Sequence, residues 1–221
     1  MNQPSGLGAP SGSWRVGVTA AGLAAIREPH VDLVCWRRAL PPGAARQLAA
    51  WAPSAPTLDR TGEALELWGD EGWYRSLTSG LEEPVRAWLE RDLRRLLRRF
   101  TEHAGPGMVR AQLAAIRGDQ CRKFHCDYVR YRLLSTYVGP GTEWLPEEAV
   151  RREALEHPTA CPTQANARAV RDASWVRRAA AGDVLLMKGA LHPDSRGAVH
   201  RSPPIENTGV VRLVWTLSTV G

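Results

Sequence analysis

The chain has 221 residues, of which 43% are hydrophobic and 24% charged, so it can bury one full-sized core. No apolar run reaches the length of a membrane span, and the first residues lack the basic end and apolar run of a signal peptide, so a cytoplasmic protein is expected. The formal net charge is +6, and of the 29 basic residues only Lys123 and Lys188 are lysines. The arginines are spread along the chain without a recognisable nucleic-acid module, so nucleic acid is not the expected partner.

The N-terminal part of the chain predicts a disordered arm and a supporting layer. Residues 1–14 are rich in Gly, Pro and Ser and offer almost no apolar surface, which predicts a disordered arm. Residues 15–221 are then expected to form a single domain, with residues 15–107 as helical support. Within that support, a short apolar run at Val31–Trp36 precedes a helix-like stretch at Gly43–Trp51 that prolines bracket.

The strongest helical pattern runs from about Glu82 to Phe100. Apolar residues recur there at helical spacing, acidic residues stand at the start, and Pro84 suits the first turn. Gly105 and the Pro-Gly pair after it are expected to end the helix. The opposite face carries six arginines and is interpreted as a solvated face.

From residue 108 onward the hydrophobic period changes to that of strands. A loop with a helix over Pro146–Glu156 is expected to interrupt these strands, followed by polar and small residues. The C-terminal half is therefore predicted to be mostly β. The expected strands, short, β-leaning and separated by Gly, Pro or Asp, are Met108–Ile116, Tyr131–Val138, Val184–Lys188 and Val210–Thr219.

Three residues in this half suit a metal ion. His125 and Asp127 are two apart, so on a strand both side chains point to one side while Cys126 points away. His200 follows the apolar run that Asp183 opens and precedes the last strand. Two imidazoles and one carboxylate form the facial triad of non-haem iron(II) oxygenases, which leaves coordination positions open.

Arg212 adds a second feature. Alternation along the last strand places Leu213 and Trp215 on one face and Arg212 with Val214 on the other. An arginine on the inner face of a barrel strand is costly unless a buried anion meets it. A guanidinium binds a carboxylate with two hydrogen bonds, so Arg212 is predicted to bind an anion.

The order His125-x-Asp127, His200, Arg212 resembles the signature of iron(II)/2-oxoglutarate-dependent oxygenases. In that superfamily a double-stranded β-helix presents the metal ligands, and the arginine binds the far carboxylate of the co-substrate. More narrowly, the chain resembles a bacterial family known as domain of unknown function 1826. The motifs that carry this second resemblance are Phe-His-x-Asp, Gly-Pro-Gly-Thr-Glu-Trp-Leu (139–145), Gly-Asp-Val-x-x-x-Lys-Gly (182–189) and His-Arg-Ser-Pro-Pro (200–204).

The resemblance implies an α+β, mainly β fold, with a double-stranded β-helix core of the jelly-roll or cupin type over residues 108–221 and packed N-terminal helices. It implies iron(II), 2-oxoglutarate and O2 as cofactor and co-substrates, and hydroxylation or another oxidation of a small molecule or peptide. The substrate itself is not implied. One departure is Val214, because the superfamily often has Ser or Thr two residues beyond the arginine.

Several alternatives stay open at the level of the sequence. His192 is the rival for the distal ligand, and Arg201 or Arg132 can replace Arg212 as the anion-binding residue. Tyr131 and Tyr137 are candidates for a hydrogen bond to the co-substrate, although tyrosines in strands usually serve packing.

The loop Gly139–Trp144 either lines a substrate pocket or places its tryptophan in a core edge. Cys121 and Cys126 beside His125 suggest a noncatalytic zinc or other divalent-metal-binding protein as the alternative function. A nucleic-acid demethylase of the same superfamily is the third hypothesis, favoured only if arginines gather beside the metal pocket.

Overall fold

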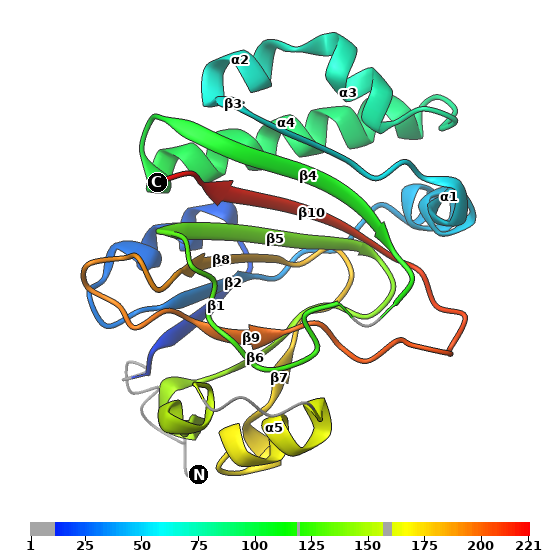
Figure 1. Ribbon diagram of the computed structural model, residues 1–221. Coiled ribbons are helices and arrows are strands. Elements are labelled where there is room, and N and C mark those ends of the chain that lie inside the picture. The colour runs from blue at the N-terminus through cyan, green and yellow to red at the C-terminus, as the bar shows by residue number, and fades with distance from the viewer. Residues whose placement is uncertain (1–11, 119, 157–160) are drawn as a thin grey trace, which may run out of the picture.

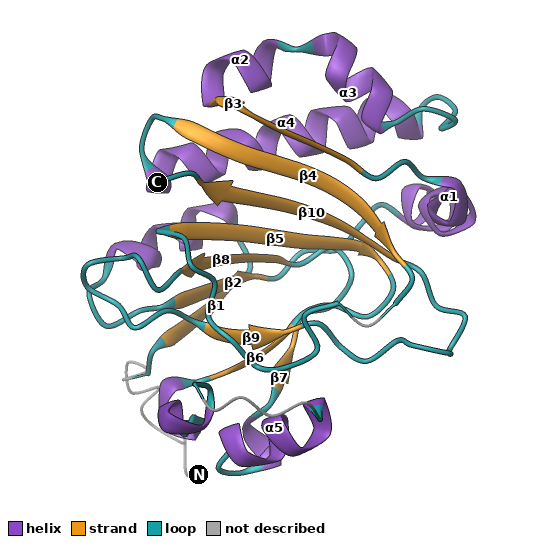
Figure 2. Ribbon diagram, in the orientation of Figure 1, coloured by secondary structure: helices purple, strands orange, loops and turns teal. Residues whose placement is uncertain are grey.

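The computed structural model describes residues 12–118, 120–156 and 161–221, and it combines two β-sheets with surrounding helices (Figures 1 and 2). The larger sheet has seven strands, in which only β1 and β2 run parallel. Their order is β1 (Trp14–Gly17), β2 (Leu33–Trp36), β8 (Val184–Lys188), β5 (Tyr131–Val138), β10 (Arg212–Thr219), β4 (Met108–Ile116) and β3 (Leu58–Glu63).

The smaller sheet faces the larger one and is made of three short antiparallel strands. It lies between the larger sheet and a layer of short helices in Figure 1. Its strands are β7 (Arg177–Arg178), β6 (Glu143–Leu145) and β9 (Val199–Arg201), in that order.

Helices cover the outer face of the larger sheet (Figure 2). The longest, α4, spans 20 residues and lies along the sheet beside α2 and α3. The α-helices are α1 (Pro42–Trp51), α2 (Ala64–Gly69), α3 (Glu71–Leu77), α4 (Val85–Ala104) and α5 (Pro162–Ala169), and the 3-10 helices are η1 (Ala20–Arg27), η2 (Ala52–Ser54), η3 (Glu147–Ala149), η4 (Arg152–Ala154) and η5 (Ala173–Trp175).

The main core lies between α4 and the larger sheet. Leu93 and Phe100 of α4 and Trp215 of β10 are fully buried in it. Burying each such side chain stabilises the fold by roughly 1.5–3 kcal/mol, so this contact holds the helix on the sheet. The amphipathic pattern that predicted the helix is therefore the pattern that packs it.

The second face of the larger sheet meets the smaller sheet. Leu134 of β5 and Val214 of β10 pack there with Trp144 of β6. Side chains alternate along a strand, so Arg212 shares this inner face with Val214 while Trp215 faces the helices. The alternation predicted for the last strand is confirmed.

Three of the predicted strands, β4, β5 and β8, have the predicted bounds, and β10 begins at Arg212 rather than at Val210. The prediction of a helix over Pro146–Glu156 is wrong, because that segment contains two 3-10 helices of three residues each, η3 and η4. Helix α5 was not expected. Gly12 to Trp14 of the expected arm lie within the described residues, and residues 1–11 lie outside them.

The fold is a mixed α/β structure consisting mostly of sheet, as expected, but the described strands do not close into a barrel. The edge strands of the larger sheet are β1 and β3, and no described strand of the smaller sheet pairs with either of them. The three strands of the smaller sheet have two or three residues each. None of the helices in the described part of the chain is long and apolar enough to cross a bilayer.

Candidate metal centre

The backbone brings the three predicted metal ligands together. His125 and His200 form an isolated antiparallel bridge, in which each backbone N–H donates to the other residue's carbonyl at 3.0 Å. Residues directly opposite in such a pair project to the same side, and Asp127, two residues further on, joins them. One ligand atom from each residue lies within 4.8 Å of the others, and the two rings are 4.7 Å apart.

Both histidines direct Nε2 toward the Asp127 carboxylate. Their Nδ1 atoms lie 2.8 Å from the Lys123 carbonyl and 3.1 Å from the Ala198 carbonyl. A carbonyl can only accept, so Nδ1 carries the proton and Nε2 of the neutral ring presents a lone pair. Two lone pairs and a carboxylate that face one another need a cation between them.

The pKa shifts of His125 and Asp127 reflect the same demand for positive charge. Burial lowers the pKa of His125, but Asp127 and the Lys123 carbonyl more than offset burial and raise it above its ordinary value. Burial raises the pKa of Asp127, but the adjacent His125 and His200 rings and the charge of Arg132 outweigh burial and hold the pKa well below its usual range. The carboxylate is thus ionised, and the site has a strong preference for positive charge.

The spacing of the ligand atoms fits a divalent ion. Asp127 Oδ2 is 3.1 Å from His200 Nε2, and Asp127 Oδ1 is 3.6 Å from His125 Nε2. Ligand atoms about 2.1 Å from an ion and at right angles to one another lie about 3 Å apart. Asp127 Oδ2 is also a buried oxygen that has no hydrogen-bond partner among the described residues. The three residues therefore fit a metal without rearrangement of the backbone.

The centre is reached from the side of His125. The His125 side chain is 32% exposed, whereas those of Asp127 and His200 are 11% and 5% exposed. A surface cavity of about 390 Å³ borders it, lined by Cys121, Arg122, Lys123, His125 and Pro162.

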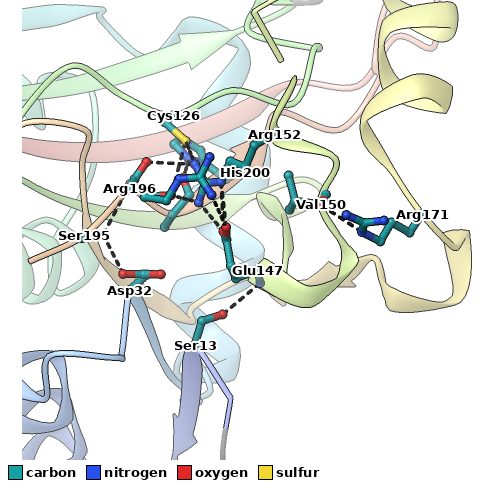
Figure 3. A network of polar contacts seen from close by, with 12 residues as sticks. Ser13, Asp32, Cys126, Glu147, Val150, Arg152, Arg171, Ser195, Arg196 and His200 are labelled. Atoms are coloured by element: carbon teal, nitrogen blue, oxygen red, sulfur yellow. Dashed lines mark hydrogen bonds and ion pairs between the residues drawn. The ribbon is translucent and has the colours of Figure 1, made fainter. Parts of the chain in front are cut away.

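Arg152 of η4 braces the segments that carry the ligands (Figure 3). Its guanidinium donates to Cys126 Sγ at 2.9 Å, between the two ligands of the first segment, and to the Gly197 carbonyl at 2.7 Å, three residues before His200. Glu147 forms an ion pair with the same guanidinium. Cys126 therefore faces away from the ligands, as predicted for the residue between them.

Arg212 is 1% exposed and no carboxylate among the described residues pairs with it. Its Nε donates to the Pro140 carbonyl at 2.7 Å and its Nη1 to Ser202 Oγ at 3.0 Å. Burial lowers the pKa of Arg212 to about 10. Arg212 is thus a buried cation whose protein partners are neutral.

Hydroxyl groups surround this guanidinium. In addition to Ser202, Thr142 Oγ1 lies 3.4 Å and Thr136 Oγ1 3.5 Å from Arg212 Nη2. The sequence interpretation missed all three. The available signals were alternation, which places Thr136 on the inner face of β5, and the position of Ser202 two residues after His200.

The rival residues are engaged elsewhere. His192 Nε2 lies 2.8 Å from the Tyr131 hydroxyl, and no described metal cluster includes it. Arg201 donates to Glu143 at 2.7 Å. The Tyr137 hydroxyl donates to Asp92 at 2.6 Å on the helix side of the sheet. Of the alternatives for Arg212, only Arg132 lies at the centre, with Nε 3.0 Å from Asp127 Oδ2.

The loop Gly139–Trp144 places its tryptophan in the core, while its Pro140 and Thr142 contact Arg212. Trp144 is 1% exposed in the core between the sheets, with its ring edge toward Trp14. Glu143 is buried between Arg178 and Arg201. A zinc site that includes Cys121 or Cys126 is not assembled among the described residues, because the cluster of potential ligands found there contains no cysteine.

Comparisons with known proteins agree with the family suggested by the motifs. Residues 17–218 match the family described as "Protein of unknown function (DUF1826)". No curated protein matches the chain.

Solved structures give only distant likenesses. A Pseudomonas putida prolyl-4-hydroxylase is 12% identical with a TM-score of 0.45, over 90% of this chain and 92% of that one. A full-length Neurospora crassa protein in complex with alpha-KG is 10% identical with a TM-score of 0.40, over 84% and 73%. HygX from Streptomyces hygroscopicus, with nickel, 2-oxoglutarate and hygromycin B bound, is 10% identical with a TM-score of 0.39, over 91% and 88%. All three TM-scores lie below 0.5, so these likenesses carry no functional conclusion.

Proposed function

The chain belongs to the family described as protein of unknown function DUF1826, and we propose that it is a non-haem iron(II), 2-oxoglutarate-dependent oxygenase. The observation that carries the proposal is the convergence of His125 Nε2, His200 Nε2 and the Asp127 carboxylate. Both rings carry their proton on Nδ1, so Nε2 of each neutral ring is free to bind a metal. Two imidazoles and one carboxylate on one side of an iron(II) ion leave positions open for a bidentate ligand and dioxygen.

Arg212 supports 2-oxoglutarate as the co-substrate. A buried cation without a carboxylate partner is expensive, and a carboxylate can bind a guanidinium with two parallel hydrogen bonds. We assign to Arg212 the distal carboxylate of 2-oxoglutarate. Ser202 and Thr142 stand beside its Nη atoms and supply the hydroxyl groups that Val214 does not.

With iron(II) and 2-oxoglutarate bound, the centre would supply oxidation of an unactivated C–H bond by dioxygen. The protein's own residues hold the reactants. Backbone carbonyls fix both imidazoles in one tautomer, and Arg152 fixes the segments that carry them. The two facing sheets are proposed to be the halves of a double-stranded β-helix that opens at His125 to a small molecule or peptide.

Equilibrium binding tests this proposal. The full chain should bind about one iron(II) per molecule, and His125→Ala or His200→Ala should weaken that binding by at least about 100-fold, since a ligand is lost. Radiolabelled 2-oxoglutarate should bind only to the metal-loaded chain, and Arg212→Gln should weaken it about 10- to 100-fold. Arg130→Gln, a change at an exposed arginine just before β5, is the matched control. Metal-loaded wild type that does not bind 2-oxoglutarate would contradict the proposal.

A further inference from the structure

Arg132 stands next to the metal centre with almost no protein partners. It lies on β5 on the inner face, as does Leu134, and its side chain is 26% exposed. Its Nε is 3.0 Å from Asp127 Oδ2, yet this buried N–H is not aligned with any acceptor in the described chain. Its ion pair with Asp127 is the one polar contact that the described residues give it.

The other arginines around the centre differ in this respect. Arg201 donates to Glu143, Arg152 to the Gly197 and Arg196 carbonyls, and Arg212 to the Pro140 carbonyl. A guanidinium has five N–H donors, and each of these residues places at least one of them on a protein acceptor at 2.7–2.8 Å. Arg132 keeps its donors available at the place where ligands of the metal must bind.

Charge balance then calls for an anion at Arg132. In the metal-free centre the positive charge of Arg132 is matched by Asp127. A divalent ion bound to Asp127 takes over that carboxylate and places a second positive charge within roughly 5 Å of the guanidinium. An anion that contacts both cations removes this repulsion, and a carboxylate fits the planar guanidinium best.

We propose that Arg132 binds the carboxylate at the keto-acid end of 2-oxoglutarate, the end that the metal takes, while Arg212 binds the carboxylate at the other end. The inference rests on the proposed function and adds a second recognition residue to it. The co-substrate is then a dianion held between two arginines, of which one is buried and the other lies at the metal. Arg132 thereby selects 2-oxo acids over neutral metal ligands.

The test uses two ligands that share one end. The full chain is loaded with iron(II) under argon and titrated with 2-oxoglutarate, or with 2-oxovalerate, which keeps the keto-acid end but lacks the distal carboxylate. Dissociation constants come from the visible charge-transfer band and from calorimetry. The variants are Arg132→Gln, Arg132→Lys and Arg212→Gln, with Arg130→Gln as the exposed control, and the affinity of each for iron(II) is measured separately.

Arg132→Gln should weaken both ligands by the same factor, about 10- to 100-fold, because the shared end is affected. Arg212→Gln should weaken 2-oxoglutarate alone. Arg132→Lys should recover part of the affinity, since it keeps the charge but not the planar pair of donors, and this recovery excludes a folding defect. Arg130→Gln should bind both ligands as wild type does.

Two results would overturn the inference. One is Arg132→Gln binding both 2-oxo acids as tightly as Arg130→Gln. The other is a loss of iron(II) affinity in Arg132→Gln that accounts for the whole effect, which would make Arg132 a positioning residue for Asp127. Iron-loaded wild type that binds neither ligand is a different result, because it would contradict the proposed function itself.

Discussion

Replacing Arg212 by methionine is expected to stabilise the ligand-free protein. Burial lowers the pKa of Arg212 from its ordinary value to about 10, and this change corresponds to about 3 kcal/mol lost by the charged form in the folded state. The substitution removes this cost but leaves the Pro140 carbonyl without its donor, at about 1–3 kcal/mol. The net expectation is a gain of about 1 kcal/mol, or a rise in Tm of about 2–4 °C for a chain of this size.

The order of stabilities should reverse when ligands are added. With iron(II) and 2-oxoglutarate at a hundred times its Kd, wild type should gain about 2.7 kcal/mol, whereas Arg212→Met should gain little beyond the effect of the metal. Thermal unfolding followed by circular dichroism under argon measures both conditions, with Arg130→Gln as the control. A variant that loses more than about 2 kcal/mol without ligand would refute the reasoning, because Arg212 would then be a structural residue.

Three further changes probe the framework of the site. Asp92→Asn should lower the free energy of unfolding in urea at pH 7 by about 3–5 kcal/mol, because it leaves Arg38 and Arg95 facing a neutral group. Burial raises the pKa of Asp92, but these arginines and the Tyr137 hydroxyl outweigh burial and lower the pKa. The difference in stability from wild type should therefore shrink, and not grow, below about pH 4. Arg152→Met should weaken iron(II) binding about 10- to 100-fold, as measured by competition with a chelator. An unchanged affinity would show that Arg152 serves only its ion pair with Glu147 and does not position the metal ligands. Gly189→Ala places a Cβ 2.1 Å from the Val129 carbonyl and should cost at least about 2 kcal/mol, whereas Gly43→Ala, which meets nothing within 4 Å, should cost less than about 0.5 kcal/mol.

The spacing of apolar residues was sufficient to predict several of the main helices and strands. The period of two along residues 108–116 and 131–138 identified β4 and β5, and the helical period identified α4 although it begins at Val85 rather than at Glu82. These elements bury one complete face each, so the pattern and the packing coincide. The smaller sheet escaped prediction because β6, β7 and β9 have three residues or fewer, too short for a period to show.

The sequence predicted those residues of the candidate site whose pattern lies within a single segment. His125 and Asp127 are two residues apart, and the alternation around Arg212 marks it as an inward-facing charge. The contacts that join separate segments were not accessible, because nothing in the sequence pairs Ser202 with Arg212 or Arg132 with Asp127. Such contacts depend on strand register, which only the tertiary structure supplies.

An anaerobic titration of the metal-free chain with iron(II) and then 2-oxoglutarate distinguishes an oxygenase from a noncatalytic metal-binding protein. We expect a weak visible charge-transfer band that appears only when both are present. The band should be absent in His125→Ala and should need far more co-substrate in Arg212→Gln. No band in wild type, together with zinc retained through purification in place of iron, would contradict the oxygenase and favour a noncatalytic metal-binding protein.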